Sequence, residues 1–234
     1  MRAVPLLLLS CAPTLAYADS LEALRSTYDQ QRSQLELERR YLSDELAQAR
    51  SPAERAELLS FARSRVLATL DQTLIPAWEG TPWSFSGTSE RPGEGSIACG
   101  FFVGTLLEHA GFRVDRLALG RLASEHIAKS LAGPRALRRY SDVEPEVVAA
   151  DLLEMGPGLY AIGLDFHAAW ARVTDDGQLW FIHSTVYGKG GVLIEPLLGD
   201  NPFFHSRYRV VAKLLGDRMM ESWLEAKTIE ARAG

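Results

Sequence analysis

The sequence predicts an α+β protein in which a helical half is followed by an antiparallel sheet. Up to Met155, apolar residues recur mainly at helical spacing. After Gly156-Pro157-Gly158 the period becomes that of strands, and short aromatic or β-branched segments are separated by turns such as Asp175-Asp176-Gly177. Because the helices precede the strands instead of alternating with them, we expect the helices to cover one face of the sheet.

Composition and charge are those of an ordinary globular protein. The chain has 234 residues, of which 47% are hydrophobic and 24% charged, and its net charge is −5. This length suits one catalytic domain with a smaller appendage. No run rich in lysine and arginine is present, so nucleic acid is not an expected partner.

The first eighteen residues have the pattern of a secretory signal peptide. Arg2 gives a short basic start, an apolar stretch from Val4 to Leu15 follows, and Ala16-Tyr17-Ala18 is a small-x-small cleavage site. The apolar stretch is too short to span a bilayer. We therefore expect residues 1–18 to be removed and the protein to be exported, to a periplasm or to the exterior.

A lipid anchor is the alternative for the same segment. Leu8-Leu9-Ser10-Cys11 resembles a bacterial lipoprotein box, in which Cys11 would be acylated. If residues 1–18 are removed, Cys99 is the only cysteine left. If Cys11 is acylated instead, Cys99 is the only cysteine with a free thiol. A single thiol in an oxidising compartment is more readily explained by chemistry than by packing.

Residues 19–75 predict a helical hairpin. The stretch 20–50 lacks glycine and proline and has an intermittent apolar stripe. Ser51 is a natural N-cap for a second helix, with Pro52 at its first position and Glu54 completing a capping box. We expect this second helix to run to about Leu74. The hairpin could pack on the catalytic domain, associate with a second copy or bind another partner.

Residues 76–216 predict the main domain. A loop over 76–98 contains several glycines and prolines, and a helix over 99–112 ends at Gly111. Further helical segments are expected at Leu117 to Leu131 and Val143 to Met155. Five strands are expected next, followed by a C-terminal helix and tail over 217–234; the strands are 158–164, 167–173, 178–184, 191–196 and 206–215.

Cys99, His167 and His183 are the candidate catalytic residues. Acyl transfer by cysteine needs an ionised thiol, a base within reach and a group that orients the base. Cys99 begins a helix, where free N–H groups and the helix dipole favour thiolate. If the strands that hold the two histidines form a hairpin, His167 and His183 become neighbours, so that one is the base and the other orients it. Backbone N–H groups around Cys99 could then form an oxyanion hole.

The order PWSFSGTS, CGFFVGTLLEHAGF and HAAWARVTDDGQLWFIHS resembles the NlpC-type, papain-like cell-wall peptidases over roughly residues 78–198. The resemblance implies a papain-like domain whose sheet packs against the cysteine helix. It also implies Cys99 as nucleophile, His167 as base and His183 as orienting residue. Trp83 falls where the family has a tyrosine beside the active site.

The chain departs from the family's pattern around the cysteine. The family typically has Asp-Cys-Ser-Gly-Phe, whereas here Ala98 precedes Cys99 and Gly100 follows it. We expect Ala98 and Gly100 to contribute to substrate binding or to the oxyanion hole. The helical insert between Gly111 and Asp165 is long, and we expect it to reshape the substrate groove.

The resulting prediction is an exported cysteine hydrolase that cleaves amide bonds, with peptidoglycan peptides as the expected substrate and no cofactor or metal. Two alternatives stay open. Asp165, His167 and His183 could instead form a two-histidine, one-carboxylate zinc site. The chain could also be a non-catalytic module that binds cell-wall polymer through Trp78, Trp83, Trp170 and Trp180, although at this spacing most of these residues are expected in the core.

Overall fold

A computed structural model describes residues 12–233, with side chains from residue 20 onward. Residues 1–11 of the predicted signal peptide, including Cys11, lie outside the described residues. Residues 12–18 begin the first helix, α1, which spans Ala12–Gln48. In no helix of the described part do length and apolar character suffice together for crossing a bilayer.

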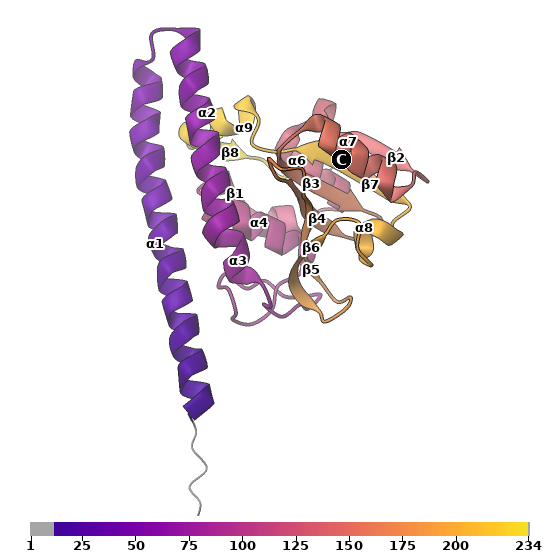
Figure 1. The fold of residues 1–234 in the computed structure, drawn as a ribbon. Helices are drawn as coiled ribbons and strands as arrows, with labels where there is room; N and C mark the ends of the chain where they lie inside the picture. Colours follow the sequence, from indigo (N-terminus) through magenta and orange to yellow (C-terminus); the bar gives the residue numbers. More distant parts are fainter. Residues whose placement is uncertain (1–11, 234) are drawn as a thin grey trace, which may run out of the picture.

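The predicted helical hairpin is present. Helix α1 is followed by α2 (Pro52–Thr69), which lies antiparallel beside it (Figure 1). The Ser51 hydroxyl accepts a hydrogen bond from the Glu54 amide at 3.1 Å, as the N-cap prediction requires. The Glu54 carboxylate accepts from the amide of Arg50 at 2.7 Å, one residue earlier than in a standard capping box.

The second helix runs further than predicted. A π-helical turn at Leu70–Leu74 joins α2 to α3 (Ile75–Trp78), so the loop begins after Trp78 and not at residue 76. Pro76 has no N–H and its ring would collide with a carbonyl of the preceding turn in a regular α-helix. The wider π-turn, in which the Ile75 amide bonds to the Leu70 carbonyl, accommodates it.

Helix α4 (Cys99–His109) begins at the cysteine, as predicted, and ends in a Schellman motif. Gly111 has a φ of +86°, and the Phe112 amide bonds to the Leu107 carbonyl at 3.0 Å. The predicted helix from Leu117 to Leu131 is instead two helices, α5 (Arg116–Gly120) and α6 (Ser124–Ala132).

The remaining helices surround the sheet. Helix α7 spans Pro145–Met155 and matches its prediction closely. A short helix α8 (Pro202–His205) precedes the last long strand. The C-terminal helix α9 (Asp217–Leu224) is shorter than the predicted segment, and a two-residue strand, β8 (Thr228–Ile229), follows it and pairs in parallel with β1 (Arg113–Val114).

The sheet has six strands, all antiparallel to their neighbours, in the order β2-β7-β3-β4-β5-β6. The five predicted strands are present within one to two residues at each end. Their bounds are β3 Gly158–Leu164, β4 Ala168–Val173, β5 Leu179–Thr185, β6 Gly191–Pro196 and β7 Tyr208–Lys213. The sixth, β2 (Arg138–Ser141), was not predicted because its sequence, RRYS, is a polar edge strand without apolar alternation.

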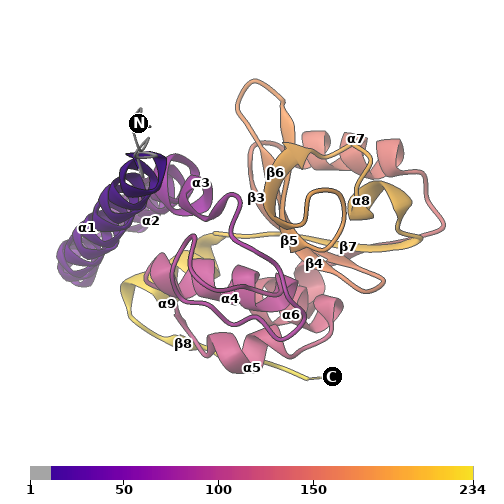
Figure 2. The same ribbon diagram turned by 90° about the horizontal axis from the view of Figure 1, so that it is seen from below.

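Helices cover both faces of this sheet, so the expectation of a single covered face was wrong. Helices α4, α6 and α9 and the hairpin share a core with one face, whereas α7 packs on the other. Figure 2 shows α4 and α7 on opposite sides of the strands. The reason is visible in β3 and β4, which are buried at almost every position and therefore need apolar cover on both sides.

The hairpin packs against the rest of the chain through a buried polar cluster as well as apolar contacts. The hydroxyl of Tyr28 on α1 lies 2.7 Å from Nδ1 of His109 on α4, and Nε1 of Trp78 donates to the same hydroxyl at 2.8 Å. The apolar stripe of α1 belongs to the main core. Leu37 and Tyr41 remain exposed on this helix. Self-association through the hairpin stays a prediction.

We expect the buried His109 to make the protein less stable in mild acid. Burial, with the positive charges of Arg32 and Arg116, lowers the pKa of His109 from 6.5 to about 3. In the unfolded chain this histidine binds a proton below about pH 6.5, whereas in the folded chain it stays neutral until the pH approaches 3. The free energy of unfolding therefore falls as the pH drops from 6.5 toward 3. Each such histidine contributes a slope of about 1 kcal/mol per pH unit.

Urea unfolding between pH 7.5 and pH 4.5 measures this slope. The variant His109→Gln keeps a hydrogen-bonding side chain beside Tyr28 and removes the titration, so its slope should be shallower than that of the wild type. The buried His167 and His183 add to the slope in both proteins. Equal slopes in the two proteins would contradict the assignment to His109.

Candidate active site

Cys99 is the first residue of α4 and is half-buried. Hydrogen bonds fix the segment before it on both sides: the Ile97 amide donates to the Pro82 carbonyl at 2.9 Å, and the Ser184 hydroxyl of β5 donates to the Ile97 carbonyl at 2.6 Å. Ser184 is the neighbour of His183. The same strand therefore holds one predicted catalytic residue and anchors the chain just before another.

The backbone at the start of α4 offers free hydrogen-bond donors. The amide of Ala98 donates to the Gly87 carbonyl at 2.9 Å, so the prediction of Ala98 as an oxyanion-hole donor is corrected. No side chain caps the start of α4. The amides of Cys99 and Gly100 have no acceptor among the described residues, as expected for the first turn of a helix. The Phe101 amide is likewise free, and of these three N–H groups those of Cys99 and Gly100 lie nearest the thiol along the chain and can serve as oxyanion donors.

The two predicted histidines are in direct contact. Strands β4 and β5 pair with Trp170 opposite Ile182, which brings the start of β4 beside the end of β5. His167 immediately precedes β4 and His183 lies in β5. Nε2 of His167 lies 2.9 Å from Nδ1 of His183, and the rings meet edge to face at 88°. The predicted hairpin is therefore present, and it makes His167 and His183 neighbours as expected.

A carboxylate that the sequence analysis missed completes this row. Oε1 of Glu195 on β6 lies 3.0 Å from Nε2 of His183. The register places Leu193 opposite His183, so Glu195 is its diagonal neighbour on the same face of the sheet. The available signal was an acidic residue inside the otherwise apolar segment GVLIEP, in the strand after the IH dipeptide.

Burial keeps both imidazoles neutral at pH 7. The His183 side chain is 0% exposed, and His167 is partly buried in front of it. Burial lowers the pKa of His167 to about 4. Burial, with the neighbouring charge of His167, lowers the pKa of His183 to about 3. A neutral imidazole has an unprotonated nitrogen that can accept a proton, which is what a base requires.

Cys99 and His167 face a common cavity of about 950 Å³. It lies where α4 begins, at the end of the sheet formed by Leu164 of β3 and Thr185 of β5. Trp83, Ala98 and Gly100 line it too, so the predicted site residues converge apart from His183, which lies behind His167. The Cys99 thiol makes no hydrogen bond with any residue whose side chain is described.

Large apolar side chains surround the mouth of the cavity, and the sequence analysis did not single them out. Phe166, next to His167, is 99% exposed, and Phe85 in the loop before Cys99 is 87% exposed. Val186 and Tyr187, after β5, are 59% and 65% exposed. Such a concentration of exposed apolar side chains around a cavity is typical of a surface that binds a ligand.

The helical insert packs closely against the start of the cysteine helix at two glycines, Gly100 on α4 and Gly120 on α5. A Cβ added to Gly100 would lie 2.6 Å from the Gly120 carbonyl oxygen at the end of α5, and a Cβ on Gly120 would lie 2.5 Å from the Phe101 ring. Helices α4 and α5 can therefore approach this closely only with glycine at both positions.

We expect Gly100→Ala to displace α5 from α4 and to impair the site. The added methyl group meets backbone, which cannot move aside as a side chain can, so we expect a loss of about 1–3 kcal/mol in stability. Differential scanning calorimetry measures the loss. Gly216→Ala is the matched control, because a Cβ at Gly216 meets nothing within 4 Å and its φ of −65° suits alanine. An equal effect of both variants would contradict close packing at Gly100.

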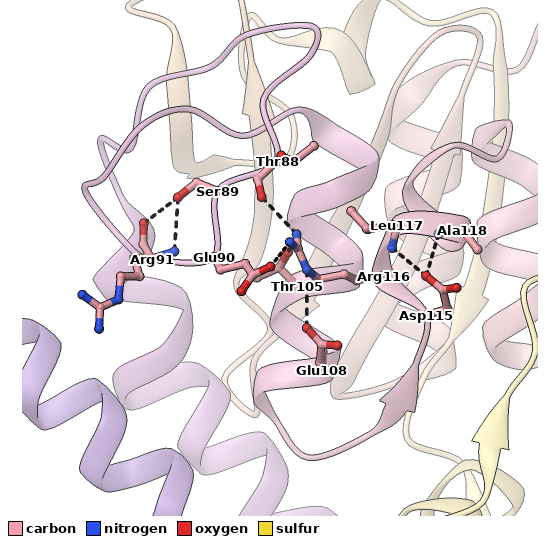
Figure 3. A network of polar contacts seen from close by, with 10 residues as sticks. All are labelled: Thr88, Ser89, Glu90, Arg91, Thr105, Glu108, Asp115, Arg116, Leu117 and Ala118. Atoms are coloured by element: carbon pink, nitrogen blue, oxygen red, sulfur yellow. Dashed lines mark hydrogen bonds and ion pairs between the residues drawn. The ribbon is translucent and has the colours of Figure 1, made fainter.

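A polar network anchors the loop that precedes Cys99 (Figure 3). The buried guanidinium of Arg116 donates to the Thr88 carbonyl at 3.1 Å and to the Thr105 hydroxyl at 3.3 Å. It also pairs with the carboxylates of Glu90 and Glu108. Arg116, on α5, thus ties the loop at Thr88 and Glu90 to the body of α4.

The zinc alternative gains no support from the arrangement of its ligands. The Asp165 carboxylate accepts from the Ser206 hydroxyl at 2.7 Å and from the Arg207 amide at 2.9 Å. The facing nitrogens of His167 and His183 bond to each other. Within the described part of the chain, no three histidine, cysteine or acidic side chains converge as metal ligands.

The alternative of a polymer-binding module loses two of its four tryptophans. Trp78 and Trp170 are fully buried in the core and cannot contact a polymer. Trp180 is 36% exposed on β5, and Trp83 lines the cavity already described. The exposed tryptophans thus form no separate binding face.

Comparisons with models of known protein families, with curated proteins and with solved structures give no match for this chain.

Proposed function

We propose that the protein is a cysteine hydrolase that cleaves amide bonds through a thioester acyl-enzyme on Cys99. The observation that carries the proposal is the meeting of Cys99 and His167 in one cavity, with His183 hydrogen-bonded behind His167. A nucleophile, a base and a group that orients the base are the three parts that acyl transfer by a thiol requires, and Cys99, His167 and His183 are the residues to which we assign these roles. We also propose, from the motif resemblance, that the domain is papain-like and of the NlpC type.

In the first half-reaction, Nδ1 of His167 accepts the Cys99 thiol proton while the sulfur attacks the substrate carbonyl carbon. Nδ1 is the available nitrogen because Nε2 is bonded to His183. The carbonyl oxygen becomes an oxyanion that the amides of Cys99 and Gly100 can bind. The Cys99 thiol has no hydrogen-bond partner among the described side chains, and catalytic hydrogen bonds of this kind often form or tighten only when substrate binds.

Collapse of the tetrahedral intermediate breaks the carbon–nitrogen bond. The proton held on His167 passes to the departing amine, which leaves the acyl group on sulfur as a thioester. In the second half-reaction His167 takes a proton from water, and the hydroxide attacks the thioester carbon. The thiolate leaves, recovers its proton from His167, and the carboxylic acid is released.

The glycine at position 100 fits this reading of a divergent site. A serine there, as in the family's motif, would bring its Cβ into the Gly120 carbonyl. The insert that supplies Gly120 also contributes Arg121 to the cavity. The altered motif and the altered groove are thus two consequences of one packing arrangement. We propose that the substrate is a peptide of the cell wall and that the protein acts after export.

Digestion of purified muropeptides, followed by mass spectrometry of the products, tests this function. The wild type should release a new amine and a new carboxylate at one amide bond, with the mass of one water added. A panel of other amides, including N-acyl amino acids, should accompany the muropeptides, since the exposed Phe85 and Phe166 favour apolar groups. If the muropeptides stay intact while another amide is cleaved, the proposed cell-wall substrate is rejected and the proposed amide hydrolysis by a cysteine is retained.

A further inference from the structure

We propose that Glu195 is a positioning residue that sets the tautomer of both histidines and so leaves Nδ1 of His167 free to receive the thiol proton. The inference rests on the proposed function and adds a fourth member to the row. Glu195 touches neither the cavity nor the nucleophile. Its effect would pass through His183, which it contacts, and then through His167.

The hydrogen bonds form one continuous row, and each link holds one proton. The first link joins Oε1 of Glu195 to Nε2 of His183 at 3.0 Å, and the second joins Nδ1 of His183 to Nε2 of His167 at 2.9 Å. A neutral imidazole has one N–H and one bare nitrogen. The direction of the first link therefore decides the direction of the second.

An ionised Glu195 fixes that direction, because a carboxylate can only accept. His183 must then donate from Nε2, which leaves its Nδ1 bare. His167 must in turn donate from Nε2 to that nitrogen, which leaves its own Nδ1 bare. This is the tautomer of His167 that can take a proton from Cys99.

A donor at position 195 reverses the row. His183 would accept at Nε2 and donate from Nδ1, and His167 would accept at Nε2 and carry its proton on Nδ1. His167 could then no longer take the thiol proton. The buried setting of His183 strengthens this coupling, because its side chain is fully enclosed and both ring nitrogens already have protein partners.

The groups that face Glu195 are few. His183 contacts it from β5, and the negative charge of Asp200 acts on it from the loop after β6, where Asp200 itself pairs with His205. Burial and, to a lesser degree, Asp200 raise the pKa of Glu195. Protonation of Glu195 in acid would reverse the row, so activity should fall on the acid side of the pH profile.

Nitrogen NMR of histidine-labelled protein reads the tautomers directly and needs no substrate. In wild type at pH 7.5, His167 and His183 should both carry the proton on Nε2 with Nδ1 bare. Glu195→Gln can accept or donate, so each ring should show a mixture of tautomers. Glu154→Gln is the matched control, an exposed carboxylate on α7, and its spectrum should equal that of the wild type. Nδ1–H on His167 in the wild type would overturn the proposal.

Kinetics give the second test. Glu195→Gln should lower kcat by about 10- to 100-fold with little change in KM, and the acid limb of its pH profile should lose the contribution of Glu195. Glu195→Asp, which keeps a pure acceptor, should recover part of the loss. A Glu195→Gln enzyme with the wild-type kcat and pH profile would overturn the inference while leaving the cysteine hydrolase standing. A wild type without amidase activity would reject the proposed function. The NMR measurement would then still decide whether Glu195 sets the tautomers of the two histidines.

Discussion

Replacement of Cys99 by alanine is expected to lower kcat/KM by about 10⁴-fold or more. The other members of such a constellation act only through the nucleophile, so its loss removes nearly all of their effect. The melting temperature should change little, because Cys99 is only half-buried and its thiol makes no hydrogen bond among the described side chains. Initial rates on the muropeptide or amide that the wild type cleaves measure the effect.

Two controls make the Cys99 result interpretable. Cys99→Ser keeps a hydroxyl in the same position, and its activity should be far below that of the wild type, because a hydroxyl is much harder to deprotonate than a thiol. Iodoacetamide should inactivate the wild type with one adduct per chain, at Cys99. Full activity in Cys99→Ala, with a folded protein, would end the thiol mechanism.

Replacement of His167 by alanine is expected to lower kcat/KM by about 10³- to 10⁴-fold. Without its imidazole, no group in the described structure is positioned to take the thiol proton, so the thiol must ionise without help. The rate of iodoacetamide alkylation at pH 7 should fall in parallel. Because alkylation reports on the thiol alone, it separates loss of the base from loss of substrate binding.

His183→Ala should have the smaller effect of the two histidine variants, because His183 acts only by holding His167. We expect a loss of about 10- to 100-fold, accompanied by a lower melting temperature because a fully buried side chain is removed. Phe166→Ala is a comparison variant at the mouth of the cavity, and it should raise KM more than it lowers kcat. A His167→Ala enzyme less affected than His183→Ala would reverse the assignment of base and orienting residue.

Local sequence patterns predicted the strands well. Segments such as GLYAIGL and GVLIEP combine β-branched or aromatic residues with clear turns on each side, and the structure contains them as β3 and β6. The Ser51 cap and the Gly111 end of α4 were equally local signals. Such signals depend on a few neighbouring residues, so the local structure that they predict does not require knowledge of distant contacts.

Features that depend on distant contacts could not be predicted. Strand β2 exists because β7 offers it an edge, and nothing in RRYS indicates that edge. The cover of both sheet faces follows from how α7 folds back, which its own amphipathic pattern does not specify. The π-turn before Pro76 likewise allows a helix to continue where a proline normally ends one.

In the candidate site, too, some contacts could be predicted from local patterns and others depend on distant parts of the chain. The contact of His167 with His183 followed from strand pairing, since a single tight turn at Asp175-Asp176-Gly177 fixes the register of both. The contact of His183 with Glu195 required a second hairpin whose register the sequence analysis did not consider. The oxyanion-hole role expected of Ala98 was wrong because its amide is bonded to Gly87, a contact across the loop with no local signal, whereas a place for Ala98 in the substrate-binding cavity stays a prediction.

Trapping of the acyl-enzyme tests the central claim most directly. After rapid mixing with an activated ester or amide substrate and an acid quench, intact-protein mass spectrometry should find one acyl group per chain. Peptide mapping should locate it on Cys99, neutral hydroxylamine should release it, and Cys99→Ala should carry none. Turnover of the same substrate with no acyl group on Cys99, and at the same rate in Cys99→Ala, would contradict the account.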